Sequence, residues 1–144
     1  MLTREDKIVP GVVWESPTVV IDARQHPLVV VKYRGTVSEA DFARHLEVLS
    51  SSLQRGQRTA VIMDTTDGAA RSPASLRKLR EWLEAERESM IKFVAGLALV
   101  VPSAAVRFIV STFMLTTDLP YPYVVVDKLD AALSYARKQL AQSA

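Results

Sequence analysis

Short runs of aliphatic and β-branched residues alternate along the chain with longer segments in which apolar residues recur every three or four positions. The short runs have the length and composition of strands, and the longer segments have the periodicity of amphipathic helices. The pattern predicts strands at 19–21, 28–33, 60–63, 96–101 and 124–126. It predicts helices from Ser38 to near Gly56 and over 73–92, 104–115 and 129–140.

The predicted order of elements is two strands followed by helix and strand in alternation (ββαβαβαβα). Strands that read as nearly continuous apolar runs are covered on both faces, and helix-sized connections between them imply parallel pairing. The turn-like segment 22–27 predicts a hairpin between the first two strands. We therefore expect an α/β domain with a mixed, mostly parallel five-stranded sheet, about four helices, and the first strand antiparallel at one end.

The first part of the chain lacks a clear pattern. It contains Pro10 and Pro17, which break regular structure. It also contains Trp14, which we expect to anchor this segment on the rest of the protein. We expect residues 1–17 to form a lead-in and residues 18–144 to form a single domain with one hydrophobic core. Three alternatives stay open for the lead-in: an added edge strand, Trp14 tucked against the sheet, or exchange onto a second copy.

Composition narrows the classes of function. The net charge of +2 is too small to indicate a nucleic-acid binder. The chain has no cysteine, which excludes disulfides, thiolate metal ligands and cysteine nucleophiles. The N-terminus has no apolar run of signal-peptide length, and polar residues or prolines interrupt the longest apolar stretches. We therefore expect a cytoplasmic protein without an integral membrane segment.

One junction is a candidate site: the segment 59–75, with the sequence TAVIMDTTDGAARSPAS. An apolar run ends on Asp64, a polar loop follows, and Ser72 with Pro73 opens the second predicted helix. In open α/β sheets, ligands, phosphates and partners collect at such junctions. Each residue also has a structural interpretation, because Ser72 can simply cap the helix and Asp64 can accept hydrogen bonds from loop amides.

The second predicted helix carries basic residues in its first part and glutamates in its last part, against the helix macrodipole. A solvated face explains this distribution, and the alternative is a basic patch that meets an acidic partner or a phosphate. The candidate residues for a partner or anion site are Asp64, Thr65, Thr66, Arg71, Ser72, Arg77 and Lys78.

The third predicted helix, 104–115, is apolar over most of its circumference and has one charged residue, Arg107. Such a helix is buried, or it covers a partner, a lipid or a second copy of itself. Burial against the second helix, a homodimer or hetero-partner interface, and an apolar ligand pocket are therefore three alternatives. The loop that follows contains tyrosines, which interfaces favour. The candidate apolar interface residues are Phe108, Ile109, Phe113 and Tyr121.

Catalytic signatures are missing from the sequence. It has no glycine-rich phosphate-binding motif and no nucleophile elbow. His26 and His45 lack the spacing of metal ligands, and the aspartates are scattered singly. We expect a non-enzymatic protein with no metal and no cofactor.

Three features of the sequence belong together: the order of elements, the AVIMD strand with the loop and helix start after it, and the GLALVVPS strand before an apolar helix. In these features the chain resembles the STAS family, and more narrowly its SpoIIAA-like (STAS/SEC14-type) bacterial members. The resemblance covers about 18–140. In the anti-sigma-factor antagonists of that family an aspartate ends the third strand and a DSSG-type motif caps the next helix. One serine of that motif is phosphorylated, and the helix start contacts a partner kinase.

Asp64 matches the strand-end aspartate of that family, and Ser72 matches the first serine of the motif. Pro73 replaces the serine that is usually phosphorylated, and Ala74 replaces the glycine. The resemblance implies a non-enzymatic regulatory module that contacts a protein partner through the loop and helix start after the third strand. One alternative is an apolar-ligand or lipid-binding domain, which the SEC14-like side of the resemblance allows. The others are a phospho-regulated anti-sigma antagonist and an enzyme that uses Asp64 with a histidine.

Overall fold

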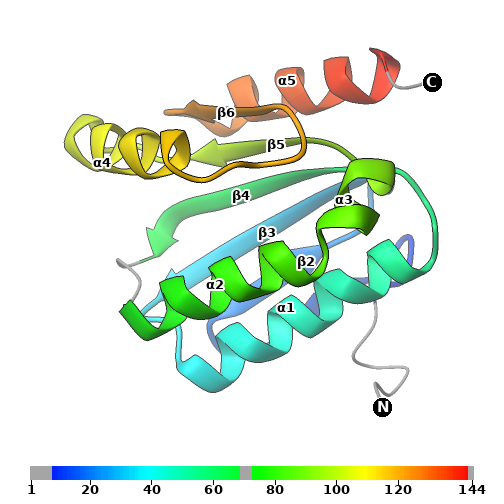
Figure 1. The fold of residues 1–144 in the computed structure, drawn as a ribbon, viewed down its shortest axis with the longest axis horizontal. Coiled ribbons are helices and arrows are strands. Elements are labelled where there is room, and N and C mark those ends of the chain that lie inside the picture. The colour runs from blue at the N-terminus through cyan, green and yellow to red at the C-terminus, as the bar shows by residue number, and fades with distance from the viewer. Residues whose placement is uncertain (1–7, 69–72, 143–144) are drawn as a thin grey trace.

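The computed structural model describes residues 8–68 and 73–142, and within these ranges it contains one six-stranded sheet and five helices (Figure 1). The strands are β1 (Val13–Glu15), β2 (Val19–Asp22), β3 (Leu28–Gly35), β4 (Thr59–Gly68), β5 (Val94–Val100) and β6 (Tyr123–Val126). The helices are α1 (Glu39–Gln54), α2 (Pro73–Ala85), α3 (Arg87–Phe93), α4 (Ala104–Leu115) and α5 (Leu129–Gln142).

The strands lie in the sheet in the order in which they occur in the chain. β1 pairs with β2, and β2 with β3, in antiparallel orientation, whereas β3, β4, β5 and β6 pair in parallel. The parallel strands are connected by helical crossovers, as parallel pairing requires. The predicted α/β class and the mixed, mostly parallel sheet are therefore confirmed.

Local sequence accounts for the ends of α1. The Ser38 hydroxyl accepts a hydrogen bond from the backbone N–H of Asp41 at 3.1 Å and so caps the first turn. Glycine follows the helix at Gly56, whose φ of 71° is a left-handed conformation that suits glycine. Between these ends one face of α1, which includes Val48 and Leu49, packs on β2 and β3.

Helices cover both faces of the sheet. α5 packs on one face, where Ala132 and Ala136 contact β4 and β5, and the other four helices lie on the opposite face (Figure 1). Successive side chains of a strand point to opposite faces. In β4, Ile62 therefore packs on the α5 side, whereas Met63 packs on the side of α4.

The numbers of strands and helices differ from the prediction. A sixth strand, β1, forms in the lead-in because this segment pairs with β2, and Trp14, the middle residue of β1, packs on the core at the α1 face. The first two alternatives for the lead-in are thus both observed. The helix predicted over 73–92 is two helices, because the backbone of Glu86 (φ −99°, ψ 8°) departs from helical geometry.

β4 is longer than the sequence predicts. The prediction that the strand ends at Asp64 is wrong, because β3 also extends and pairs with the last residues of β4, up to Gly35 beside Gly68. Thr65 and Thr66 are consequently strand residues and not loop residues.

Candidate functional site

The side chains of the three candidate residues near the end of β4 form hydrogen bonds with nearby groups of β4 and β5. The carboxylate of Asp64 accepts a hydrogen bond from the backbone N–H of Thr66 at 3.0 Å, and the Thr66 hydroxyl donates to the same oxygen. The Thr65 hydroxyl donates to the backbone carbonyl of Val100 at 2.6 Å and so ties β4 to β5. These hydrogen bonds stabilise the end of the strand. They agree with the structural interpretation of Asp64, in which its carboxylate accepts hydrogen bonds from nearby amides.

Asp64 and the basic candidates of α2 lie on opposite faces of the sheet. Ile62 packs on the α5 side, so the alternation along the strand directs Asp64 to that side as well. α2 lies on the other face, next to α1 (Figure 1). The structure therefore does not bring Asp64 together with Arg77 or Lys78.

α2 presents basic side chains to solvent. Arg77 and Lys78 are both exposed, and the first turn of α2 contains no acidic residue. Among the residues that the structure describes, neither cation has a carboxylate within ion-pair distance. Arg71 and Ser72, the candidates that precede α2, lie outside the described residues. The first half of α2 is thus a positively charged surface.

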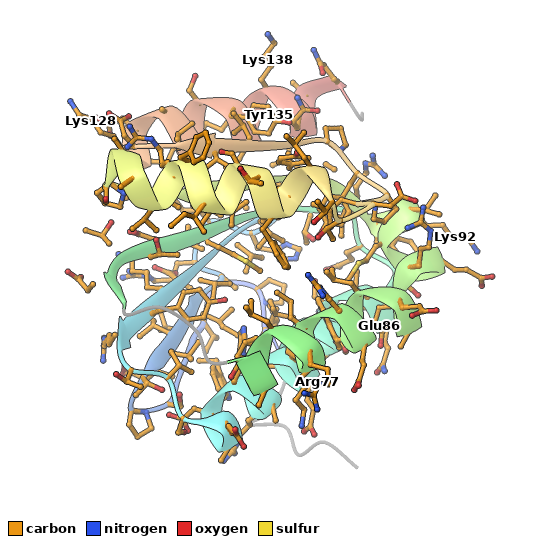
Figure 2. The ribbon with its side chains drawn as sticks, turned by 60° about the vertical axis from the view of Figure 1, so that its left-hand side comes forward. Arg77, Glu86, Lys92, Lys128, Tyr135 and Lys138 are labelled. Carbon is orange, nitrogen blue, oxygen red and sulfur yellow. The ribbon has the colours of Figure 1, made fainter. Side chains whose placement is uncertain are left out.

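Two consecutive hydrogen bonds determine which side of α2 packs against the rest of the protein. The indole N–H of Trp82 donates to Ser50 Oγ on α1 at 2.8 Å, and Ser50 Oγ donates to Oε1 of Glu86 at 3.2 Å. Trp82 and Leu83 are partly buried against the cores around α1 and α3. The basic side chains are consequently held on the outer side of the helix, as Figure 2 shows for Arg77.

α4 exposes large apolar side chains. Phe108 is 75% exposed, Ile109 is 66% exposed and Leu115 is 80% exposed. Met114 is the one residue of this described helix that is buried. Burial against the second helix, one of the three alternatives for this segment, therefore does not account for its apolar surface.

The other two candidate apolar residues are turned inward. Phe113 is partly buried in the cluster around Met114, and the guanidinium carbon of Arg80 on α2 lies 4.8 Å from the centre of its ring. Tyr121 is also partly buried, and this burial raises the pKa of its hydroxyl. The predicted apolar set is thus divided: Phe108 and Ile109 are exposed, whereas Phe113 and Tyr121 join α4 and its loop to the rest of the fold.

A groove of about 360 Å³ lies between α2 and the segment that follows α4. The guanidinium of Arg87 joins its two sides, because it donates to the backbone carbonyl of Asp118 at 2.8 Å and pairs with the Asp118 carboxylate at 3.1 Å. The walls contain two basic and two acidic side chains, Arg80, Arg87, Glu84 and Asp118. Sequence reasoning missed this groove, since its partners lie 31 positions apart and share no local pattern.

A small cavity, partly open to solvent, lies between the sheet and the helices. Its walls are mainly apolar and include Leu49, Trp82 and Tyr121, and its volume is about 40 Å³. Small-molecule sites in proteins measure roughly 300–1,000 Å³. This cavity is therefore too small for the apolar ligand that the alternative hypothesis requires.

The two histidines do not form a common site. His45 is buried, its Nδ1 donates to the carbonyl of Phe42, and its Nε2 accepts from the Tyr33 hydroxyl at 3.1 Å. His26 lies in the turn between β2 and β3. Among the described residues, no group of three or more histidine, aspartate or glutamate side chains is placed to hold a metal ion. In that same part of the chain, every helix is too short or too polar to cross a membrane.

Two solved structures share this fold over most of their length. One is an uncharacterized protein of the DUF3478 family from Shewanella loihica PV-4, which has a SpoIIAA-like fold; the TM-score is 0.61 at 15% identity, over 82% of this chain and 91% of that chain. The other is an anti-sigma factor antagonist from Mycobacterium paratuberculosis; the TM-score is 0.54 at 14% identity, over 90% of this chain and 97% of that chain. No family model and no curated protein matches the sequence. The chain thus has a STAS-like fold, as the resemblance implies.

Proposed function

We propose that this chain is a non-enzymatic regulatory module that binds an acidic surface of a protein partner through the outer side of α2. The observation that carries the proposal is the exposed pair Arg77 and Lys78, which has no ion-pair partner among the described residues. One protein with the same fold is an anti-sigma factor antagonist, which supports a regulatory function exerted on another protein.

The helix itself compensates these charges poorly. Arg77 and Lys78 lie in the second turn of α2, where a cation still opposes the macrodipole but only weakly, because the effect falls off beyond the first turn. A partner with carboxylates at this surface would neutralise the charges. It would also be drawn to the surface during encounter, since complementary potentials raise association rates.

We extend the proposed surface from α2 to the residues that directly precede it in the sequence, Arg71 and Ser72. Thr66 is exposed, but its hydroxyl donates to Asp64 on the other face of the sheet, so it is not part of this surface. Asp64 and Thr65 have a supporting function in this proposal, because their hydrogen bonds hold the end of β4 in place. We expect the protein to act in the cytoplasm.

The other hypotheses have weaker support. The apolar-ligand hypothesis would require the cavity beneath Trp82 to expand several-fold beyond its volume of about 40 Å³. Regulation by phosphorylation would have to act without the usual serine, because Pro73 occupies that position. An enzyme that uses Asp64 with a histidine would need a second group near that carboxylate, and His45 is buried in contacts with Tyr33 and Phe42.

The test is a charge reversal with a matched control. The double variant Arg77→Glu, Lys78→Glu changes the proposed surface. The control, Arg137→Glu, Lys138→Glu, reverses the same pair of residue types at exposed positions of α5, on the other face of the sheet (Figure 2). Each tagged protein captures partners from the lysate of its host, and the captured proteins are quantified by mass spectrometry. The affinity of the purified partner is then measured at two salt concentrations.

We expect one partner to be depleted by the α2 variant and retained by the control, with an affinity at least about tenfold lower for the α2 variant at low salt. Circular dichroism must show that both variants are folded. Equal depletion by both variants, or full retention by the α2 variant, would contradict the proposal.

A further inference from the structure

The sheet ends at β6 with backbone groups that face outward. β5 donates to β6 from Leu97 N–H to the carbonyl of Pro122 at 2.9 Å, and from Val101 N–H to the carbonyl of Val126 at 2.8 Å. In a parallel ladder alternate residues bond to the same neighbour, so the N–H and C=O groups of Tyr123 and Val125 point away from β5. In the part of the chain that the structure describes, no strand lies beyond β6.

β6 is short and follows Pro122, but it lacks the other features that protect exposed edges. Its four residues, Tyr123 to Val126, include no charged residue, no proline and no glycine, and all four are only partly buried. Edge strands in soluble proteins are commonly blocked by charges, prolines or bulges, because an open edge is a template for another strand. The edge is therefore available for pairing.

One side of α4 faces the same edge. Met114 packs on the sheet, and Phe113 faces Arg80 of α2. The side of α4 opposite to Phe113 is therefore directed away from α2. Because α4 contacts β6, this side extends past the β6 edge. The residues on that side recur at spacings of four, three and four, and they are Ala104, Phe108, Ser111 and Leu115. We name this set the α4 stripe. The one charged residue of α4, Arg107, is engaged elsewhere, since it donates to the carbonyls of Val101 and Pro102.

We propose that two copies of this chain pair through β6 and the α4 stripe about a two-fold axis. Antiparallel pairing centred on Val124 lets Tyr123 exchange both of its outward hydrogen bonds with the partner subunit's Val125, and Val125 with the partner subunit's Tyr123. The sheet then continues from one copy into the other, and each outward backbone group gains a partner. This surface is separate from the α2 surface of the proposed function and does not rest on it.

The same axis brings the two α4 helices together. An axis perpendicular to the sheet keeps both α4 helices on one face and makes them antiparallel. Because α4 lies over the outermost strands, the helices are about two strand spacings apart, roughly 10 Å, which is a normal distance for packed helices. In this arrangement the α4 stripes of the two copies face each other, with Phe108 and Leu115 as their large side chains and Ala104 and Ser111 as their small ones.

The area is consistent with a weak dimer. Phe108 and Leu115, the large exposed residues of the α4 stripe, present on the order of 300 Å² of apolar surface per copy. Two such surfaces bury about 600 Å² in total, to which the paired β6 strands add, and this places the dimer among weak, transient associations. The charge-free character of the stripe favours a second identical surface over the acidic partner proposed for α2.

The test measures the mass of the full chain by sedimentation across a concentration series, from low micromolar to several hundred micromolar. Leu115→Asp introduces a charge on the α4 stripe at an exposed position, so the monomer should remain folded. Val125→Pro removes an outward N–H that the monomer does not use, and proline is tolerated on edge strands. Ile91→Asp on α3 is the control, because Ile91 is 55% exposed and lies away from this edge.

We expect the wild type to be a dimer at the upper concentrations. Leu115→Asp and Val125→Pro should each weaken the dimer at least about tenfold, whereas Ile91→Asp should leave it unchanged. A wild type that stays monomeric throughout the series would overturn the proposal, as would a dimer that Leu115→Asp does not weaken. A dimer that is sensitive to Leu115→Asp but not to Val125→Pro would overturn the strand pairing.

Discussion

The half of the molecule around α1 and the half around α4 and β6 use apolar residues differently. α1 buries residues along its whole length against β2 and β3, and Phe42 and Val48 are almost inaccessible to solvent. α4 has a higher apolar content, yet Met114 is its one buried residue in the described structure, and each residue of β6 is only partly buried. Apolar content alone therefore does not tell which helix belongs to the core.

The comparison separates stability from recognition. In the α1 half, apolar groups and buried polar groups such as His45 find their partners within the chain. In the α4 half, both the apolar side chains and the edge of β6 are left open. We expect substitutions in the first half to change the free energy of unfolding, and substitutions in the second half to change association.

The largest expected effect is at Phe42, and it tests this division directly. Phe42→Ala should lower the free energy of unfolding by about 3–5 kcal/mol, because it removes a buried aromatic ring and leaves a cavity. The matched variant Phe108→Ala changes the same residue type where it is 75% exposed, and should cost less than about 0.5 kcal/mol. Urea denaturation of dilute protein measures both. Similar losses of unfolding free energy for the two variants would contradict the proposed difference between the α1 half and the α4 half.

A smaller effect is expected where α2 is attached to the α1 half. Ser50→Ala removes the acceptor of the Trp82 N–H and the donor to Glu86, so it should cost about 1–2 kcal/mol. Ser134→Ala, at an exposed position of α5, should cost almost nothing. If the two serine variants are equally stable in thermal denaturation, these hydrogen bonds do not hold α2 in place.

The smallest expected effect is a pH dependence at the rim of the α1 half. The hydrogen bond from the Arg24 guanidinium holds the pKa of the Asp22 carboxyl below its usual value. A lowered pKa in the folded state means that the pair stabilises the fold above the unfolded pKa of about 3.9, and that this contribution is lost as the pH falls through the folded value. Arg24→Gln should therefore be slightly less stable than the wild type near about pH 6 and equally stable near about pH 2. A difference that is the same at both pH values would show that the ion pair is not its cause.

Local sequence was sufficient to predict the elements whose ends are set by their own residues. Ser38 and Gly56 mark the ends of α1, and the apolar strands mark the mixed sheet. The errors come from contacts between distant residues. β4 continues past Asp64 because β3 runs beside it, and β1 exists because β2 offers an edge.

The candidate site was predicted less well, for a related reason. Periodicity shows that a helix has an apolar face but not which neighbour covers it, so it could not tell that Phe108 is exposed while Phe113 is turned inward. The candidate set placed Asp64 in one site with Arg77 and Lys78, whereas strand alternation directs Asp64 to the α5 side. Arg77 and Lys78 are exposed on α2, and their function as a surface that binds a partner stays a prediction.

The central claim is that the α4 and β6 edge is an open surface that a second copy completes, whereas the opposite edge, β1, takes part in no such pairing. Hydrogen exchange of individual amides, measured by NMR at a low and a high protein concentration, tests this claim most directly. We predict that the amides of Tyr123 and Val125 exchange more slowly at the high concentration, whereas the amides of β1, at the opposite edge, exchange at the same rate at both concentrations. Exchange at Tyr123 and Val125 that does not depend on concentration would contradict the claim.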